Sequence, residues 1–190
     1  MLLRPSPLLQ MTEFYSRVLA LDIRARRLGF VVLEGPDRIL DFGVRFFASS
    51  PDSSGLAALA ARKVAGLVLY FRPDLVLLRG NSRRSLRNRP ARHRALKAIR
   101  TELQSLHVPV KFIRESHVQH HFKKLGRLDR YQMAESLAAR YTQLAWRLPP
   151  KRKSWQSEQA IFCVFDAVAL AAVHFHSEVS RDATPNTSLS

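Results

Sequence analysis

Short apolar runs separated by polar turns dominate the first part of the chain. Val18–Ile23, Gly29–Leu33 and Ile39–Phe47 each have the length and composition of a β-strand. Gly35-Pro36-Asp37 marks a turn between the second and third runs. The first run is apolar at successive positions, as in a strand covered on both faces. We therefore expect an antiparallel meander at the start of a buried sheet.

The rest of the chain alternates between helical and strand patterns. In chain order we first predict a helix from Ser53-Ser54 to Phe71 and a strand at Leu75–Leu78 that ends at Arg79-Gly80. A helix with Leu96, Ile99 and Leu103 on one face and a strand at Val108–Ile113 follow. The last two elements are a helix capped by Asp129 with Gln132 and a helix from about Ser157 to His176. The last helix is apolar on every side, so we expect it in the interior.

Length and apolar content indicate one domain. At 190 residues the chain suits a single core. We expect the domain at 17–177, an N-terminal extension at 1–16, with Met11 as an alternative start, and a disordered tail at 178–190. Prolines interrupt the first residues where a signal peptide would be apolar, and no run has transmembrane length, so we expect no membrane partner. With Cys163 as the single cysteine, we expect a cytoplasmic protein.

The charge balance changes this picture of an ordinary domain. Lys and Arg total 31 against 15 Asp and Glu, which gives a net charge of +16. Such an excess predicts a nucleic-acid partner. Lys and Arg residues cluster in three segments. The residues in these segments that we expect to contact phosphate are Arg79, Arg83, Arg84, Arg87, Arg89, Lys123, Lys124, Arg130, Lys151, Arg152 and Lys153. Trp155 beside the last segment either stacks on a base or packs on its own loop.

Two acids lie inside apolar sequence. Asp22 ends the first strand and Asp166 is in the middle of the last helix. An unpaired buried carboxylate is costly, so each needs a partner. Asp22 either accepts bonds from turn amides or binds a metal, and Asp166 needs a cation, which an Arg or a metal can supply.

The order of elements and several motifs together resemble the RuvC-type Holliday-junction resolvases, a ribonuclease H-like family. Asp166-Ala167-Val168-Ala169-Leu170-Ala171-Ala172-Val173-His174-Phe175-His176 is similar to the final helix of that family. Phe71-Arg72-Pro73-Asp74-Leu75-Val76-Leu77-Leu78 resembles the segment before its second acid, and Asp22 with Gly29-Phe30 resembles its first motif. The resemblance covers roughly Arg17 to His176.

The resemblance implies an α/β fold with a five-stranded mixed sheet, three antiparallel strands then parallel ones, flanked by helices. It also implies a divergent, Mg²⁺- or Mn²⁺-dependent endonuclease on branched DNA, in recombination and repair. DNA is favoured over RNA, and a homodimer is expected. Asp22 and Asp166 match two of the family's four carboxylates, but Arg79 and Cys163 occupy the positions of the other two.

These departures leave two function classes open. In an active nuclease, Asp22 and Asp166 hold metal ions, with Glu115 after the fifth strand as a substitute ligand. In a degenerate relative, Arg79 pairs with Asp22 or Asp166 and the protein binds nucleic acid without cutting it. A third alternative is a zinc site of His117, His120 and His121.

Overall fold

The computed structural model describes residues 17–24, 26–47, 53–80, 90–127, 129–153, 155 and 157–182. The predicted extension at 1–16 and the end of the predicted tail lie outside these residues. So do four of the phosphate-contact candidates: Arg83, Arg84, Arg87 and Arg89.

A five-stranded mixed sheet forms the centre of the molecule, in the order β3-β2-β1-β4-β5. Its strands are β1 (Arg17–Ile23), β2 (Arg27–Glu34), β3 (Arg38–Phe46), β4 (Leu75–Gly80) and β5 (Val110–Arg114). The first three strands pair antiparallel, and β4 lies parallel to both β1 and β5. This is the predicted ribonuclease H-like arrangement, which the structure confirms.

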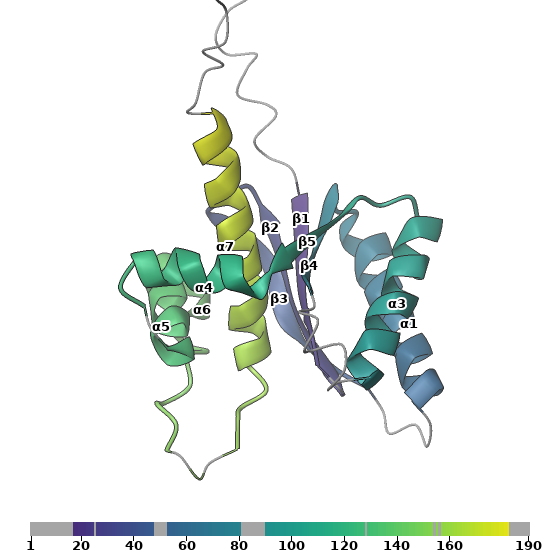
Figure 1. Ribbon diagram of the computed structural model, residues 1–190, viewed down its shortest axis with the longest axis horizontal. Helices are drawn as coiled ribbons and strands as arrows, with labels where there is room; N and C mark the ends of the chain where they lie inside the picture. Colours follow the sequence, from purple (N-terminus) through teal and green to yellow (C-terminus); the bar gives the residue numbers. More distant parts are fainter. Residues whose placement is uncertain are drawn as a thin grey trace, which may run out of the picture.

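Helices cover both faces of the sheet (Figure 1). One face carries α1 (Ser53–Phe71) and α3 (Pro90–Ser105), and the other carries α4 (Glu115–Lys124), α5 (Arg130–Arg140), α6 (Thr142–Ala145) and α7 (Phe162–Asp182). Because side chains alternate along a strand, β1 supplies both cores. Val18 and Ala20 pack on the α7 side, while Leu19 and Leu21 pack on the α1 side. The same alternation directs Asp22 towards α7.

Two helices differ from the sequence-based prediction. The segment at Glu115–Lys124 was assigned no element and forms α4, because Val118 and Phe122, one turn apart, suffice to bury one side of it. The last helix begins at Phe162 rather than near Ser157, and it continues past His176 to Asp182. Part of the predicted tail is therefore helical.

None of the helices among the described residues combines the length and apolarity needed to cross a membrane.

Candidate functional site

Asp22 lies near the carboxyl end of β1, the central strand, and its residue is 1% exposed. It is paired with Gly29 of β2. On its other side the parallel register matches Leu21 with Leu78, which places Asp22 beside Arg79 of β4. Two residues that are far apart in sequence are thus brought together by strand pairing alone.

Gly29 allows α7 to approach the sheet at this point. A Cβ at Gly29 would lie 2.2 Å from the backbone carbon and oxygen of Cys163, closer than real Cβ contacts come. The first turn of α7 therefore lies directly on β2. Asp166 follows Cys163 by three residues and lies on the same side of the helix. It therefore faces the sheet near Asp22, and only 2% of the Asp166 residue is exposed.

Arg24 joins the two carboxylates. Its Nε donates to Asp22 Oδ2 and its Nη2 donates to Asp166 Oδ2, each at 2.6 Å. Arg24 follows the end of β1 by one residue, and its backbone N–H bonds to Arg27 O in the turn to β2. Since Asp22 and Arg24 are two apart, their side chains leave the extended backbone on the same side. The Arg24 guanidinium therefore joins Asp22 to Asp166, which lies 142 positions after Arg24.

Arg79 joins the same two carboxylates from β4. Its Nε is 3.2 Å from Asp22 Oδ1 and its Nη2 is 3.2 Å from Asp166 Oδ1. The Nε–Oδ1 approach is an ion pair without hydrogen-bond alignment, since neither atom has a hydrogen-bond partner among the described residues. The side chain is only 11% exposed. The predicted pairing of Arg79 is confirmed, and its assignment as a phosphate contact stays a prediction.

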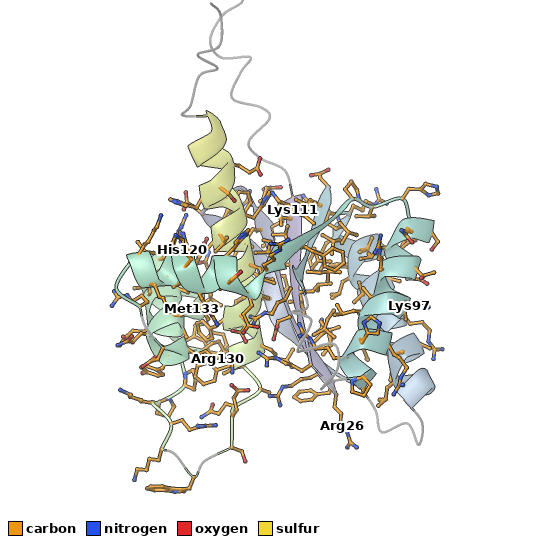
Figure 2. The ribbon with its side chains drawn as sticks, viewed as in Figure 1. Arg26, Lys97, Lys111, His120, Arg130 and Met133 are labelled. Carbon is orange, nitrogen blue, oxygen red and sulfur yellow. The ribbon has the colours of Figure 1, made fainter. Side chains whose placement is uncertain are left out.

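Arg130, the first residue of α5, supplies a third guanidinium. It binds Asp166 through Nε and Nη2, and its Nη1 pairs with Glu158. The predicted capping box of Asp129 with Gln132 fixes the start of this helix. Arg130 also lies over the Phe162 ring, 5.1 Å from the centroid. Figure 2 shows it beside the lower part of α7, and its assignment as a phosphate contact stays a prediction.

We call Asp22, Arg24, Arg79, Arg130 and Asp166 the arginine–carboxylate cluster. Burial alone would raise the pKa of Asp166, but the guanidiniums of Arg79, Arg130 and Arg24 outweigh it and hold that pKa below its usual value. For Arg24, burial opposes the charged form, and Asp22 and Asp166 still raise its pKa. Asp166 and Arg24 are thus both ionised near neutral pH.

The described residues around the cluster offer few ligands for a divalent metal. Among the described residues, no group of three His, Cys, Asp or Glu side chains is placed to hold an ion. Glu115, the predicted substitute, is half exposed and its Oε1 lies 3.7 Å from Arg79 Nη1. Cys163 has a pKa raised to about 12 by burial and by Asp22, and its thiol donates to Ala160 O. A protonated thiol and neutralised carboxylates are poor ligands for Mg²⁺ or Mn²⁺.

Glu158 lies before the start of α7 and pairs with Arg130. The zinc alternative rests on His117, His120 and His121, which lie on α4. The His121 ring lies 4.7 Å from that of His176, but among the described residues no group of three such side chains is placed to hold a metal ion.

Five predicted phosphate contacts are exposed on the surface: Lys123, Lys124, Lys151, Arg152 and Lys153. Arg92, by contrast, is buried and donates from Nε to Ile23 O at 3.0 Å. It thereby attaches α3 to the end of β1.

The sequence-based analysis missed Arg24 as a charge partner and the role of Gly29. Arg24 carried a usable signal, since an arginine two residues beyond a buried acid lies on the same side of a strand. The pairing of Arg130 with Asp166 had no such signal, because it depends on how α5 packs beside α7.

Comparison with solved structures gives the class of this fold. RuvC of Thermus thermophilus in complex with a Holliday junction substrate is 18% identical, with a TM-score of 0.63 over 86% of this chain and 96% of that chain. Another T. thermophilus RuvC structure is 19% identical over the same shares of both chains, with a TM-score of 0.64. The yeast mitochondrial Holliday junction resolvase Ydc2 is 15% identical, with a TM-score of 0.61 over 88% of this chain and 81% of that chain.

No protein-family model and no curated protein sequence matches the chain. The chain has the RuvC-type, ribonuclease H-like fold. Where its sequence departs from the resolvase motifs, it carries an arginine–carboxylate cluster.

Proposed function

We propose that this protein is a divergent member of the RuvC-type family that binds branched or structured DNA without metal-dependent cleavage. The observation that carries the proposal is the bridging of Asp22 and Asp166 by both Arg24 and Arg79. Every carboxylate oxygen of these two acids lies within ion-pair distance of a guanidinium. The oxygens that would ligate an ion are already engaged.

The charge of the cluster opposes metal binding. Asp22 and Asp166 face three guanidiniums, and Glu158, which pairs with Arg130, balances the third, so no carboxylate charge is left over for a divalent ion. At an effective dielectric constant of about 20, a guanidinium about 4 Å from a divalent ion repels it by roughly 8 kcal/mol. Displacing a guanidinium instead would leave a buried charge unpaired, which is also unfavourable. The cluster therefore acts as a connection between β1, β4, α5 and α7 rather than as a reaction centre.

Exposed cations support DNA as the partner. Lys151, Arg152 and Lys153 are exposed on the segment that leads to α7, and Arg26 projects from the end of the sheet near the cluster (Figure 2). The net charge of +16 favours any polyanion. The shared fold with a resolvase bound to its junction favours branched DNA over RNA and a two-fold dimer. A cytoplasmic location and a role in recombination or repair stay part of this proposal.

The test is incubation of the purified protein with a labelled four-way junction, a matched duplex and a single strand, with Mg²⁺, with Mn²⁺ and with EDTA. We expect binding that EDTA leaves unchanged, that falls steeply with salt, and that yields no cleavage. Asp22→Asn checks for residual activity. Metal-dependent cleavage that this substitution abolishes would show that the protein is a nuclease, and no binding at low salt would remove DNA as the partner.

A further inference from the structure

The two tryptophans of the chain are both exposed. Trp146 is 69% exposed and Trp155 is 76% exposed. Neither ring contributes to the two apolar cores. Of its own loop, Trp155 contacts the Lys153 side chain, and most of the ring stays exposed. Large aromatic rings left in solvent indicate a contact surface when other groups beside them suit the same ligand.

A cation accompanies each ring. The Cζ of Arg147 lies 3.8 Å from the ring centroid of Trp146, and the Nζ of Lys153 lies 5.4 Å from that of Trp155. In both pairs the cation comes from the same short stretch of chain as the ring. An exposed aromatic ring with a cation over one face offers stacking and charge to the same ligand.

The segment between α6 and α7 carries these pairs, and it is held to the core by other residues. Leu148 packs against the α7 core, Pro149 is buried, and Ile161 closes the segment against the same core. The apolar anchors are thus separate from the tryptophans. In Figure 1 this segment extends below α5 and α7, at the end of the molecule where Figure 2 places Arg130 and Arg26.

We propose that Trp146 and Trp155 form a stacking site for unpaired bases, with Arg147, Lys151 and Lys153 holding the adjoining phosphates. The ligand class is single-stranded DNA or the splayed bases of a branched structure. Bases inside a duplex present only their edges, so a ring can stack only where a base has left the helix. The inference rests on the proposed DNA binding and specifies which DNA the surface takes.

Intrinsic fluorescence tests this site directly, because the whole chain has two tryptophans and both belong to it. The full-length protein is titrated with a short oligothymidylate, with an abasic oligonucleotide of equal length, and with a blunt duplex, each labelled so that binding is also followed by anisotropy. We expect oligothymidylate to quench the tryptophan emission strongly. The abasic strand should bind through its phosphates with little quenching, and the duplex should quench less than the single strand.

Variants separate stacking from charge. Trp146→Leu and Trp155→Leu should each weaken oligothymidylate binding about tenfold and leave abasic binding unchanged. Tyr70→Leu is the matched control, because Tyr70 is 80% exposed on α1, on the other face of the sheet. It should change neither affinity. Lys153→Gln should weaken both oligonucleotides and reduce the slope of affinity against salt.

Two outcomes overturn the site. The first is equal affinity of the wild type for the abasic strand and for oligothymidylate. The second is unchanged affinity for oligothymidylate in both tryptophan variants. In either case DNA binding itself would stand. If no strand, duplex or junction binds at low salt, the stacking site and the proposed function both fail.

Discussion

The two ends of the sheet use the same residue types in opposite surroundings. At the amino end of β1, Arg17 pairs with Glu34 at 3.1 Å and donates to Phe71 O, while Glu34 also pairs with Arg38 at 2.6 Å. These side chains remain in contact with water, and that of Arg38 is 70% exposed. At the carboxyl end, Asp22 and Asp166 are buried and their arginines are mostly covered.

The burial of an ion pair decides how much stability is lost when the pair is broken. Exposed pairs are weak, because water and salt screen them and long side chains lose freedom. A buried pair gives little net gain over an apolar core, but breaking one leaves a charge that the interior cannot solvate. The amino-end pairs are therefore dispensable, whereas each member of the arginine–carboxylate cluster depends on the others.

Arg79→Glu should have the largest effect. It replaces a shared cation with a third carboxylate beside Asp22 and Asp166, so the loss of stability should exceed the roughly 3–5 kcal/mol expected from removing one member of a buried pair. Mn²⁺ should restore part of the lost stability, since three converging carboxylates can bind the ion. Thermal unfolding with Mn²⁺ and with EDTA measures both effects. Wild-type protein should show no shift with Mn²⁺, and a wild-type shift comparable to that of the variant would contradict the account of the cluster.

Arg79→Ala should destabilise the protein by roughly 3 kcal/mol, near the lower end of that range because Arg24 and Arg130 remain. Arg38→Ala is the matched control at the amino end, and it should change the free energy of unfolding by less than about 1 kcal/mol. Urea unfolding measures both. Equal effects of the two substitutions would remove the distinction between the two ends.

Acid should weaken the cluster through Asp166. The guanidiniums hold the pKa of Asp166 below its unfolded value of about 3.9, so its contribution is present above that pH and is lost as the pH falls through the native pKa. We expect Asp166→Asn to be less stable than wild type at pH 7 and the gap to narrow as the pH falls below about 4. Urea unfolding over this pH range measures the gap. A gap that does not change with pH would mean that ionised Asp166 is not what the arginines stabilise.

The smallest effect is expected at the amino end. Glu34→Gln removes the partner of Arg17 and Arg38 and should lower stability by less than about 1 kcal/mol at low salt. The difference should vanish near 1 M salt, where charges are screened within about 3 Å. Melting temperatures at both salt concentrations test this. A loss that persists at high salt would mean that these pairs also act as buried ones.

The strands and the burial of both acids could be predicted from apolar runs, because the period of such runs is local. The mixed sheet and the place of Arg79 near Asp22 were implied by the resemblance to the RuvC-type family. The sequence did not reveal α4, which buries only Val118 and Phe122, or the start of α7 at Phe162.

Which cations neutralise Asp22 and Asp166 depends on how the helices and strands pack in the tertiary structure. Arg130 and Arg92 belong to stretches rich in basic residues, and the sequence pattern of such a stretch does not distinguish a buried arginine from an exposed one. The choice depends on the approach of α7 at Gly29 and on the packing of α5 and α3 at the end of β1. An ion pair forms wherever the fold brings opposite charges within reach and excludes water, and that distance is not encoded in any single segment.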